Sequence, residues 1–217
     1  MINEIIKKIE ALSGKYSGYE IFSDWVKAMA ISISNASDIF HNDIYKKRED
    51  QYMEIVKKHG SNMEAFSEMF LMLEIALKNE ITDVLGQIYM QASLGSKQTG
   101  QFFTPFHLSM LTASIVVPEN INEQNKLIMN EPSAGAGGMI IAAARVLKER
   151  GMNPQKCMRV VAQDLDWKGV YMTYVQLSLL GIKAIVVQGD TLCEPFNEKT
   201  YPPERVLYTP TKKGLLI

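Results

Sequence analysis

The sequence predicts an α/β protein in which a helical domain precedes a domain built on a short parallel sheet. Three observations support this fold class. Through the first 95 residues, apolar side chains recur at helical spacing. From about residue 127, short β-rich segments alternate with helices, and a glycine-rich segment joins the first strand to the next helix. We therefore expect a helical domain over residues 1–95 and a sheet domain over residues 96–217.

Composition limits the classes of function. The chain has 217 residues, of which 47% are hydrophobic, so it is long enough to bury a core. Its 23 basic and 24 acidic residues nearly cancel. A lone DNA-binding module usually carries a basic excess, so any DNA contact is expected from a local patch or from a partner subunit.

Cysteine content and hydropathy indicate a cytoplasmic protein. Cys157 and Cys193 are the only cysteines and show no metal-like spacing, so we expect neither a disulfide framework nor a metal site. No apolar run approaches the roughly 18 residues that a membrane span requires, and the first residues have no signal-peptide core.

Helical periodicity and capping signals define the first half. An opening helix carries Ile2, Ile5 and Ile9 on one face and ends at Ser13-Gly14, and a second helix is expected from Gly18 to Ser34. A Ser-x-x-Glu capping box at residues 61–64 is expected to begin a third helix. The basic runs at residues 46–48 and 57–58 favour solvated helix faces, with phosphate contact as the alternative.

In the second half, strands and helices alternate. Strands are expected at residues 127–129, 159–162, 184–187 and 205–208, and helices at residues 138–150 and 168–180. Strand–helix–strand units of this length favour parallel pairing with right-handed crossovers. The sequence therefore predicts a doubly wound sheet.

The most informative segment is Asn-Glu-Pro-Ser-Ala-Gly-Ala-Gly-Gly at residues 130–138. It follows a strand and opens a helix, which is where a parallel sheet places its ligand crevice. Glycines there let the backbone turn sharply and approach a ligand closely. The segment has no Gly-Lys-Ser/Thr ending, which argues against hydrolysis of a nucleoside triphosphate.

Residues 131–138 resemble the Asp/Glu-Pro-x-x-Gly-x-Gly-Gly motif of the adenine-specific (N-6) DNA methylases, especially the modification subunits of type I restriction–modification systems. Four further segments occur in the family's order. Residues 100–105 resemble its Gly-x-Phe-Tyr/Phe-Thr-Pro segment, and residues 83–89 resemble the helix before it. Residues 162–166 and 188–192 are similar to its Gly-Gln-Glu/Asp and Gly-Asp-Thr/Ser-Leu strand ends. The resemblance covers about residues 81–192.

The resemblance implies a Rossmann-like methyltransferase domain with a short, truncated parallel sheet that binds S-adenosylmethionine. By this resemblance Asp164 would bind the ribose diol, Leu165 would pack on the adenine, and Asp190 would accept a hydrogen bond from the adenine amine. Asp164 as a helix cap and Asp190 as a turn residue are the structural alternatives. Phe196 is expected in the core, with closure of the adenine pocket as the alternative.

The methionine end of the cofactor has its own expected residues. Glu131 would face the ammonium group, and Phe103 would lie against the cofactor. Thr104 is expected as the N-cap of a helix with Pro105 at its first position, so that free amides bind the carboxylate. The rest of the expected cofactor-binding set consists of Pro132, Ser133, Ala134, Gly135, Gly137, Thr191 and Leu192.

The family's fourth strand ends in Asn/Asp-Pro-Pro-Tyr/Phe, whose first residues accept hydrogen bonds from the target amine of a flipped adenine. The matching residues 208–211 are Tyr-Thr-Pro-Thr, so Thr209 and Pro210 stand at the catalytic positions as a degenerate motif. Residues 201–203, Tyr-Pro-Pro, precede the strand, and we prefer Thr209 because the acceptor belongs at the strand's carboxyl end. We expect the sheet order 3-2-1-4, with the edge near Tyr208 covered by the N-terminal helices or a second copy.

Two functions remain open on this resemblance. The first is an S-adenosylmethionine-dependent methyltransferase that acts on the exocyclic amine of adenine in DNA, contacted directly or through a specificity-type subunit. The second is a degenerate homologue that binds the cofactor as a regulatory or assembly subunit. Methyl transfer to a small molecule or a protein is a weaker third alternative.

Overall fold

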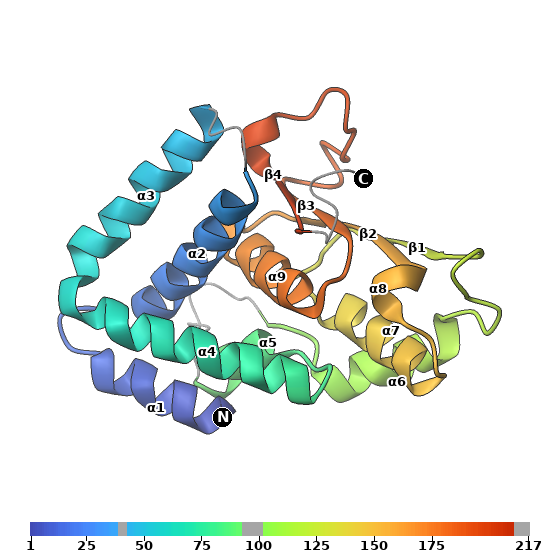
Figure 1. Ribbon diagram of the computed structural model, residues 1–217, viewed down its shortest axis with the longest axis horizontal. Coiled ribbons are helices and arrows are strands. Elements are labelled where there is room, and N and C mark those ends of the chain that lie inside the picture. The colour runs from blue at the N-terminus through green and yellow to red at the C-terminus, as the bar shows by residue number, and fades with distance from the viewer. Residues whose placement is uncertain (39–42, 93–101, 211–217) are drawn as a thin grey trace.

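The computed structural model describes residues 1–38, 43–92 and 102–210. The fold is mixed α/β, with the N-terminal helices lying beside a four-stranded sheet (Figure 1). One apolar core joins the two parts and runs from Ile5 in the first helix to Leu207 in the last strand. The domain boundary expected after residue 95 lies outside the described residues.

The three helices expected in the N-terminal part are present, but the capping box expected at residues 61–64 is not. They are α1 Ile2–Leu12, α2 Gly18–Ser37, α3 Asp43–His59, α4 Met63–Asn79 and α5 Val84–Gln91. A capping box forms at Ser17 and Glu20, at the start of α2. The box expected at residues 61–64 does not form, because Ser61 lies in a 3₁₀ turn, Gly60–Asn62, whereas an N-cap residue needs an extended backbone.

Helices α2, α4 and α5 pack on α9, Trp167–Leu180, which belongs to the sheet domain. Helix α2 lies along α9, and the buried Lys168 donates hydrogen bonds of 3.2 Å to the hydroxyls of Tyr19 in α2 and Tyr89 in α5. Trp25 of α2 donates to the carbonyl of Phe66 in α4 at 3.0 Å. These contacts fix the helical part against the sheet. No helix in the described ranges has both the length and the apolar character of a membrane span.

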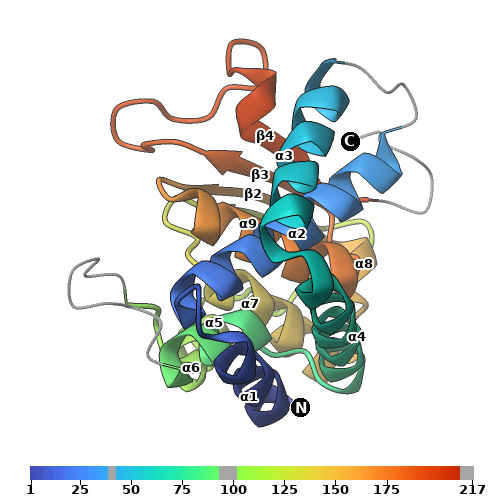
Figure 2. The same ribbon diagram turned by 90° about the vertical axis from the view of Figure 1, so that its left-hand side faces the viewer.

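Three parallel strands lie side by side, and a fourth runs against them. The strands are β1 Leu127–Glu131, β2 Met158–Asp164, β3 Ala184–Gln188 and β4 Val206–Tyr208, in the order β1-β2-β3-β4. Helices α7, Gly138–Glu149, and α8, Pro154–Cys157, connect β1 to β2, and α9 connects β2 to β3. Both crossovers step in the same direction, so α7 and α9 lie on one face of the sheet (Figure 2).

The expected order 3-2-1-4 with a parallel fourth strand is wrong, because β4 pairs antiparallel with β3. The connection between them contains one 3₁₀ turn, Pro203–Arg205, and no helix long enough to carry the chain back across the sheet. Instead, the Tyr201 hydroxyl and the Arg205 Nε both donate to the Gln188 carbonyl, at 2.9 and 3.0 Å. These bonds hold the returning chain beside β3 and leave β1 as an edge, where Ile128 is 82% exposed.

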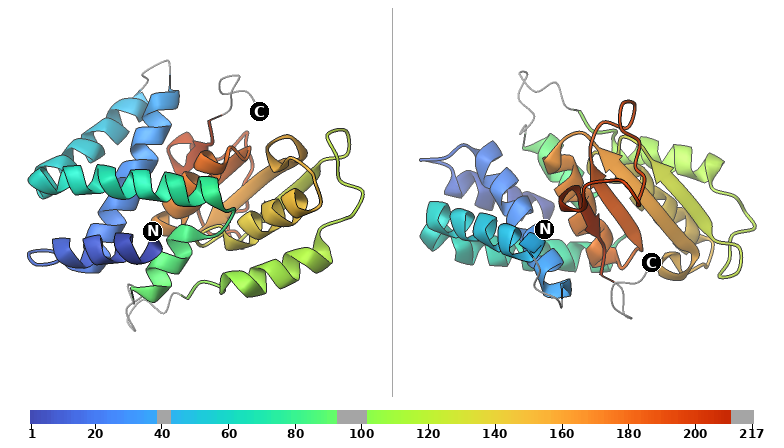
Figure 3. Two further views of the ribbon diagram at one scale, coloured as in Figure 1. Left: turned by 60° about the horizontal axis from the view of Figure 1, so that its bottom comes forward. Right: turned by 90° about the horizontal axis from the view of Figure 1, so that it is seen from above.

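The chain that leads into β4 lies over the second face of the sheet at β3 and β4 (Figure 3). Ile185, Val187, Tyr201 and Val206 form a separate apolar cluster there, with Phe196 packed against it. At the β4 edge, Arg48 of α3 donates to the Val206 carbonyl at 3.0 Å. The expectation that an N-terminal helix covers this edge is therefore confirmed, and one residue of the basic run at 46–48 is a structural contact.

Thr209 has a structural role just past β4. Its buried hydroxyl accepts a hydrogen bond from the Ala184 amide at 2.8 Å and donates to the Ile182 carbonyl at 2.8 Å. We predict that Thr209→Val lowers the free energy of unfolding by about 1–3 kcal/mol, since both backbone groups lose their side-chain partner. Urea unfolding checks this value. Thr209→Ser is the matched control and should unfold near the wild-type midpoint, whereas a stable Val variant would contradict the assignment.

Candidate functional site

The carboxyl ends of the three parallel strands bring Glu131, Asp164 and Gln188 to one edge of the sheet. The register pairs Glu131 with Ala162 and Asp164 with Gln188, so the ends of β1, β2 and β3 are adjacent. Asp164 also fixes the loop after β1, because its Oδ2 accepts a hydrogen bond from the Gly135 amide at 2.7 Å. Its Oδ1 accepts from the Asp166 amide at 2.9 Å. This carboxylate therefore joins two of the strand ends.

The glycine loop after β1 needs its glycines for both conformation and space. Gly135 and Gly137 have φ angles of 55° and 87°, which L side chains rarely adopt. A Cβ on Gly135 would lie 2.8 Å from Cδ1 of Phe103. The ring of Phe103 thus lies directly against the loop, and its other neighbour is Tyr89 of α5, at a centroid distance of 4.9 Å.

A hollow of about 170 Å³ opens between these parts, and we call it the glycine-loop hollow. Its walls are residues 102–104, residues 133–136, the first two residues of α7, and the side chains of Asp83, Ser109 and Asp164. The two acids are its only charged residues among those described. A second hollow of about 480 Å³, between α5 and α6 (Phe106–Val116), shares Asp83, Phe103 and Thr104 with it.

Gln176 of α9 connects the glycine loop to the N-terminal helices. Its buried amide nitrogen donates to the Ala136 carbonyl and to Oδ1 of Asp83, both at 2.8 Å. Its amide oxygen accepts from the backbone of Val84 and Leu85, at 2.8 and 3.0 Å. One side chain therefore sets the distance between the loop and the start of α5.

Burial changes the ionisation of two acids at this site. Asp83 is 3% exposed, and burial raises its pKa to about 6, although hydrogen bonds from Gln176 and the Gly86 amide oppose the change. Burial also raises the pKa of Glu131, and the nearby charge of Asp164 adds to the effect. The site is therefore acidic and partly dehydrated, which favours a cationic ligand.

A sequence model of the N-6 DNA methylase family matches residues 80–210, more than half of the chain. The chain belongs to the N-6 DNA methylase family. Among curated proteins, none matches it with significant sequence similarity. The matched range contains Asp83 and the whole glycine loop. All described residues that line the glycine-loop hollow therefore lie within the part of the chain that matches the family.

The methylase fold brings together part of the predicted cofactor set. The glycine-loop hollow is lined by Phe103, Thr104, Ser133, Ala134, Gly135 and Asp164. Pro105 lines the hollow between α5 and α6. Thr104 is not the N-cap of α6, because this helix begins at Phe106 and the cap position belongs to Pro105, whose ψ of 134° is extended.

The remaining predicted residues, which include Glu131, Pro132 and Gly137, lie outside the walls of this hollow, so Glu131 is not placed to bind an ammonium group within it. Asp190 accepts hydrogen bonds from the amides of Leu192 and Cys193, which lower its pKa. Thr191 donates to the Pro132 carbonyl at 2.7 Å and so holds the β3 end against the glycine loop. Leu165 and Leu192 are 67% and 94% exposed, which leaves two apolar side chains uncovered beside the strand ends.

Thr209 and Pro210 are not brought to the edge of the sheet where β1, β2 and β3 end. Because β4 is antiparallel, its carboxyl end lies beside Ala184, at the start of β3. The chain before β4 comes to the ligand edge instead, where Tyr201 bonds the Gln188 carbonyl. The preference for Thr209 over residues 201–203 relied on a parallel strand, and the direction of β4 removes that reason.

Sequence reasoning missed Asp83 and Ser109 as parts of the hollow. Asp83 lies in a quoted motif segment, but its carboxylate faces the site only because α5 packs beside α9. Ser109 is one of three hydroxyl residues in α6, with Thr112 and Ser114, so nothing in the sequence distinguished it from the other two. In the described ranges, no group of three His, Cys, Asp or Glu residues is placed to hold a metal ion.

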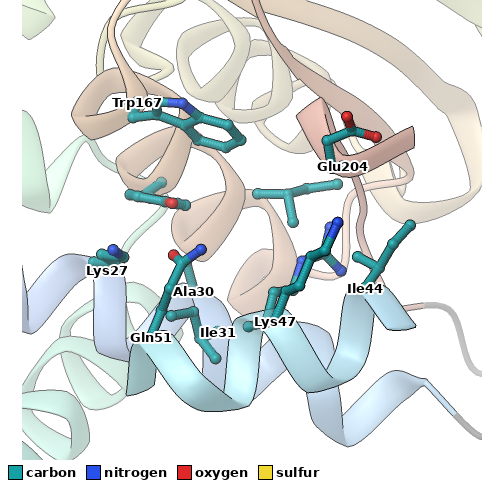
Figure 4. A pocket seen from close by; sticks show the side chains of 11 residues that line it. Lys27, Ala30, Ile31, Ile44, Lys47, Gln51, Trp167 and Glu204 are labelled. Carbon is teal, nitrogen blue, oxygen red and sulfur yellow. The ribbon is translucent and has the colours of Figure 1, made fainter. Parts of the chain in front are cut away.

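A third hollow, of about 460 Å³, lies between α2, α3 and α9 and contains none of the predicted cofactor residues (Figure 4). It is lined by Lys27, Lys47 and Arg48, and by Trp167, whose ring stacks on Tyr171 at 5.1 Å. It is larger than the glycine-loop hollow, but its described walls include no carboxyl end of a parallel strand and no glycine. We therefore place the candidate site at the glycine loop.

Asp83 gives this protein a defined dependence of stability on pH. Because the folded pKa of about 6 exceeds the usual value of 3.8, the unfolded chain ionises first, and stability falls as pH rises between them. The shift corresponds to a cost of about 3 kcal/mol above pH 6. We predict that Asp83→Asn, which keeps an acceptor for the Gly86 amide, raises the unfolding temperature at pH 7.5.

Thermal unfolding at two pH values checks this sign. At pH 4 the Asn variant should unfold at nearly the wild-type temperature, since Asp83 is then protonated in the folded protein. A variant that is less stable than wild type at pH 7.5 would show that the Asp83 carboxylate stabilises the fold.

Proposed function

We propose that this methylase binds S-adenosylmethionine at the glycine-loop hollow of a Rossmann-like domain. The observation that carries the proposal is a hollow at the carboxyl ends of parallel strands, with close glycine backbone and with Asp83 and Asp164 as the charged side chains among its described walls. A sulfonium cofactor with an ammonium group is positively charged at both of these atoms, which suits such walls. The residues that line the hollow therefore fit the methionine end of this cofactor, which carries the sulfonium and ammonium groups.

The strand ends beyond the hollow suit the nucleoside end of the cofactor. Asp164 uses one lone pair on each oxygen within the protein and keeps further acceptor capacity for a ribose diol. Leu165 follows β2 and Leu192 lies in the turn after β3, and both are exposed large apolar side chains against which an adenine ring would pack. Asp190 stands beside Leu192, with a carboxylate available to the adenine amine.

We propose adenine in DNA as the substrate class, which the family supports. When bound, the cofactor supplies an electrophilic methyl group on its sulfonium. The adenine amine would form the new C–N bond as the S–C bond breaks, and it would lose a proton to a nearby acceptor. A base within a duplex must be flipped out to reach such a site.

A second candidate function is cofactor binding without transfer, as a regulatory or assembly subunit. The position of Thr209 favours it, because the described residues place this hydroxyl inside the β3–β4 pair and not beside the hollow. In that case another chain supplies the groups that accept hydrogen bonds from the adenine amine. The two candidates share the cofactor site and differ only in transfer.

Two measurements test these candidates in sequence. Calorimetry with S-adenosylmethionine should show saturable binding by the purified chain. Transfer of a tritiated methyl group to unmodified DNA then selects the first candidate, and binding without transfer selects the second. A chain that binds no cofactor in the first experiment excludes both.

We predict that Gly135→Leu and Asp164→Ala each weaken cofactor binding by at least about 100-fold, a loss of roughly 3 kcal/mol. The first change puts a side chain against Phe103 at a positive φ angle, and the second removes the carboxylate that holds the Gly135 amide. Calorimetry of each variant gives the affinity.

Gly60→Leu is the matched control for Gly135→Leu. It also places Leu at a positive φ angle, 47°, but no atom lies within 4 Å of its Cβ position. It should keep the wild-type cofactor affinity. Equal affinities of wild type, Gly135→Leu and Asp164→Ala would mean that the cofactor binds elsewhere.

A further inference from the structure

Two buried oxygens face the same point in the glycine-loop hollow, above the first residue of α7. A Cβ placed on Gly138 would lie 3.3 Å from Oδ2 of Asp83 and 3.6 Å from Oγ of Ser109. Ser109 is fully buried, and its hydroxyl has no hydrogen-bond partner within the described part of the chain. A buried polar group normally has a partner, so this hydroxyl marks a place where one is missing.

Oδ2 of Asp83 is not needed to cap α5. Within the described ranges, the donors to this carboxylate are the Gly86 amide and Gln176, and both bond Oδ1 at 2.8 Å. The other amides at the start of this helix, those of Val84 and Leu85, donate to Gln176. The second oxygen of a buried carboxylate is thus left facing the hollow, an arrangement that is costly unless a donor binds there.

The charges around this point favour a small cation that donates hydrogen bonds. Asp164 is the other charged residue of the hollow, and it is also acidic. The adjoining hollow is lined by Glu80, His107 and Arg145. The charge of Arg145 is balanced, because this residue forms ion pairs with Glu80 and Glu149. An ammonium group has three donors and one positive charge, so it can satisfy both a carboxylate oxygen and a hydroxyl.

We propose that Asp83 and Ser109 form a binding subsite for the α-ammonium group of the cofactor's methionine moiety, with Gly138 leaving the room that the group occupies. This inference rests on the proposed function, because it takes the nucleoside cofactor as the ligand. It places the amino-acid end of the cofactor between the start of α5, α6 and the start of α7. The specificity for an amino-acid-bearing nucleoside then comes from helices outside the sheet.

Calorimetry on the full chain at pH 7.5 tests the subsite with two probes. S-adenosylhomocysteine carries the amino-acid group, and 5′-methylthioadenosine has the same nucleoside thioether without it. For Asp83→Asn we expect the affinity for S-adenosylhomocysteine to fall at least about tenfold, which is 1.4 kcal/mol, while that for methylthioadenosine stays within about twofold. Ser109→Ala should show the same selective loss with a smaller factor.

Gly138→Ala is an independent variant, because it fills the space between the two oxygens with a methyl group. Alanine is a better helix former than glycine, so the start of α7 should not be weakened. We expect this variant to lose affinity for S-adenosylhomocysteine alone. Gly14→Ala adds the same methyl group where no atom lies within 4 Å and should change neither affinity.

The outcomes separate the subsite from the cofactor proposal. If Asp83→Asn loses affinity for both probes by the same factor, or for neither, the subsite is overturned while cofactor binding stands. If the wild-type chain binds neither probe, the cofactor proposal fails and the subsite with it.

Discussion

The buried amide of Gln176 is the contact on which the geometry of the site depends. It uses both of its hydrogen-bonding atoms fully, with two bonds donated and two accepted. Through them, α9 holds the glycine loop, the start of α5 and the Asp83 carboxylate at fixed separations. Because Gln176 lies in the middle of the helix that packs against both β2 and the N-terminal helices, the two halves of the chain meet at the ligand edge. A site built by only one half would lack either the glycine loop or the acid that faces it.

Stability and binding make opposite demands on Asp83. Burial raises its pKa to about 6, so the charged carboxylate opposes folding at neutral pH. The same burial removes competing water, which strengthens any bond that a cationic ligand makes to Oδ2. Ligand sites are expected to contain such groups, whose charge lowers the stability of the free protein and strengthens the binding of a ligand. Thr209 shows the reverse case, since its hydroxyl is fully used within the fold.

Much of the fold followed from local patterns. The strand segments, the two crossover helices and the opening helix lie where periodicity placed them, because apolar spacing reports which face of an element is buried. The ligand edge was also predictable, since carboxyl ends of parallel strands must meet. The motifs quoted for residues 131–138 and 83–89 identified the family that the match over residues 80–210 shows. Asp164, Gly135 and Phe103 were accordingly expected at the hollow, and they line it.

The sequence by itself determined the family, the strand–loop–helix unit that carries the glycines, and the residue types at the strand ends. Only the tertiary structure decided the direction of β4, and with it the place of Thr209, because pairing partners depend on contacts such as that of Tyr201 with Gln188. It also decided that Asp83 and Ser109, which lie far apart in the chain, face one point. Periodicity describes one element at a time, whereas a hollow between three helices depends on how they pack.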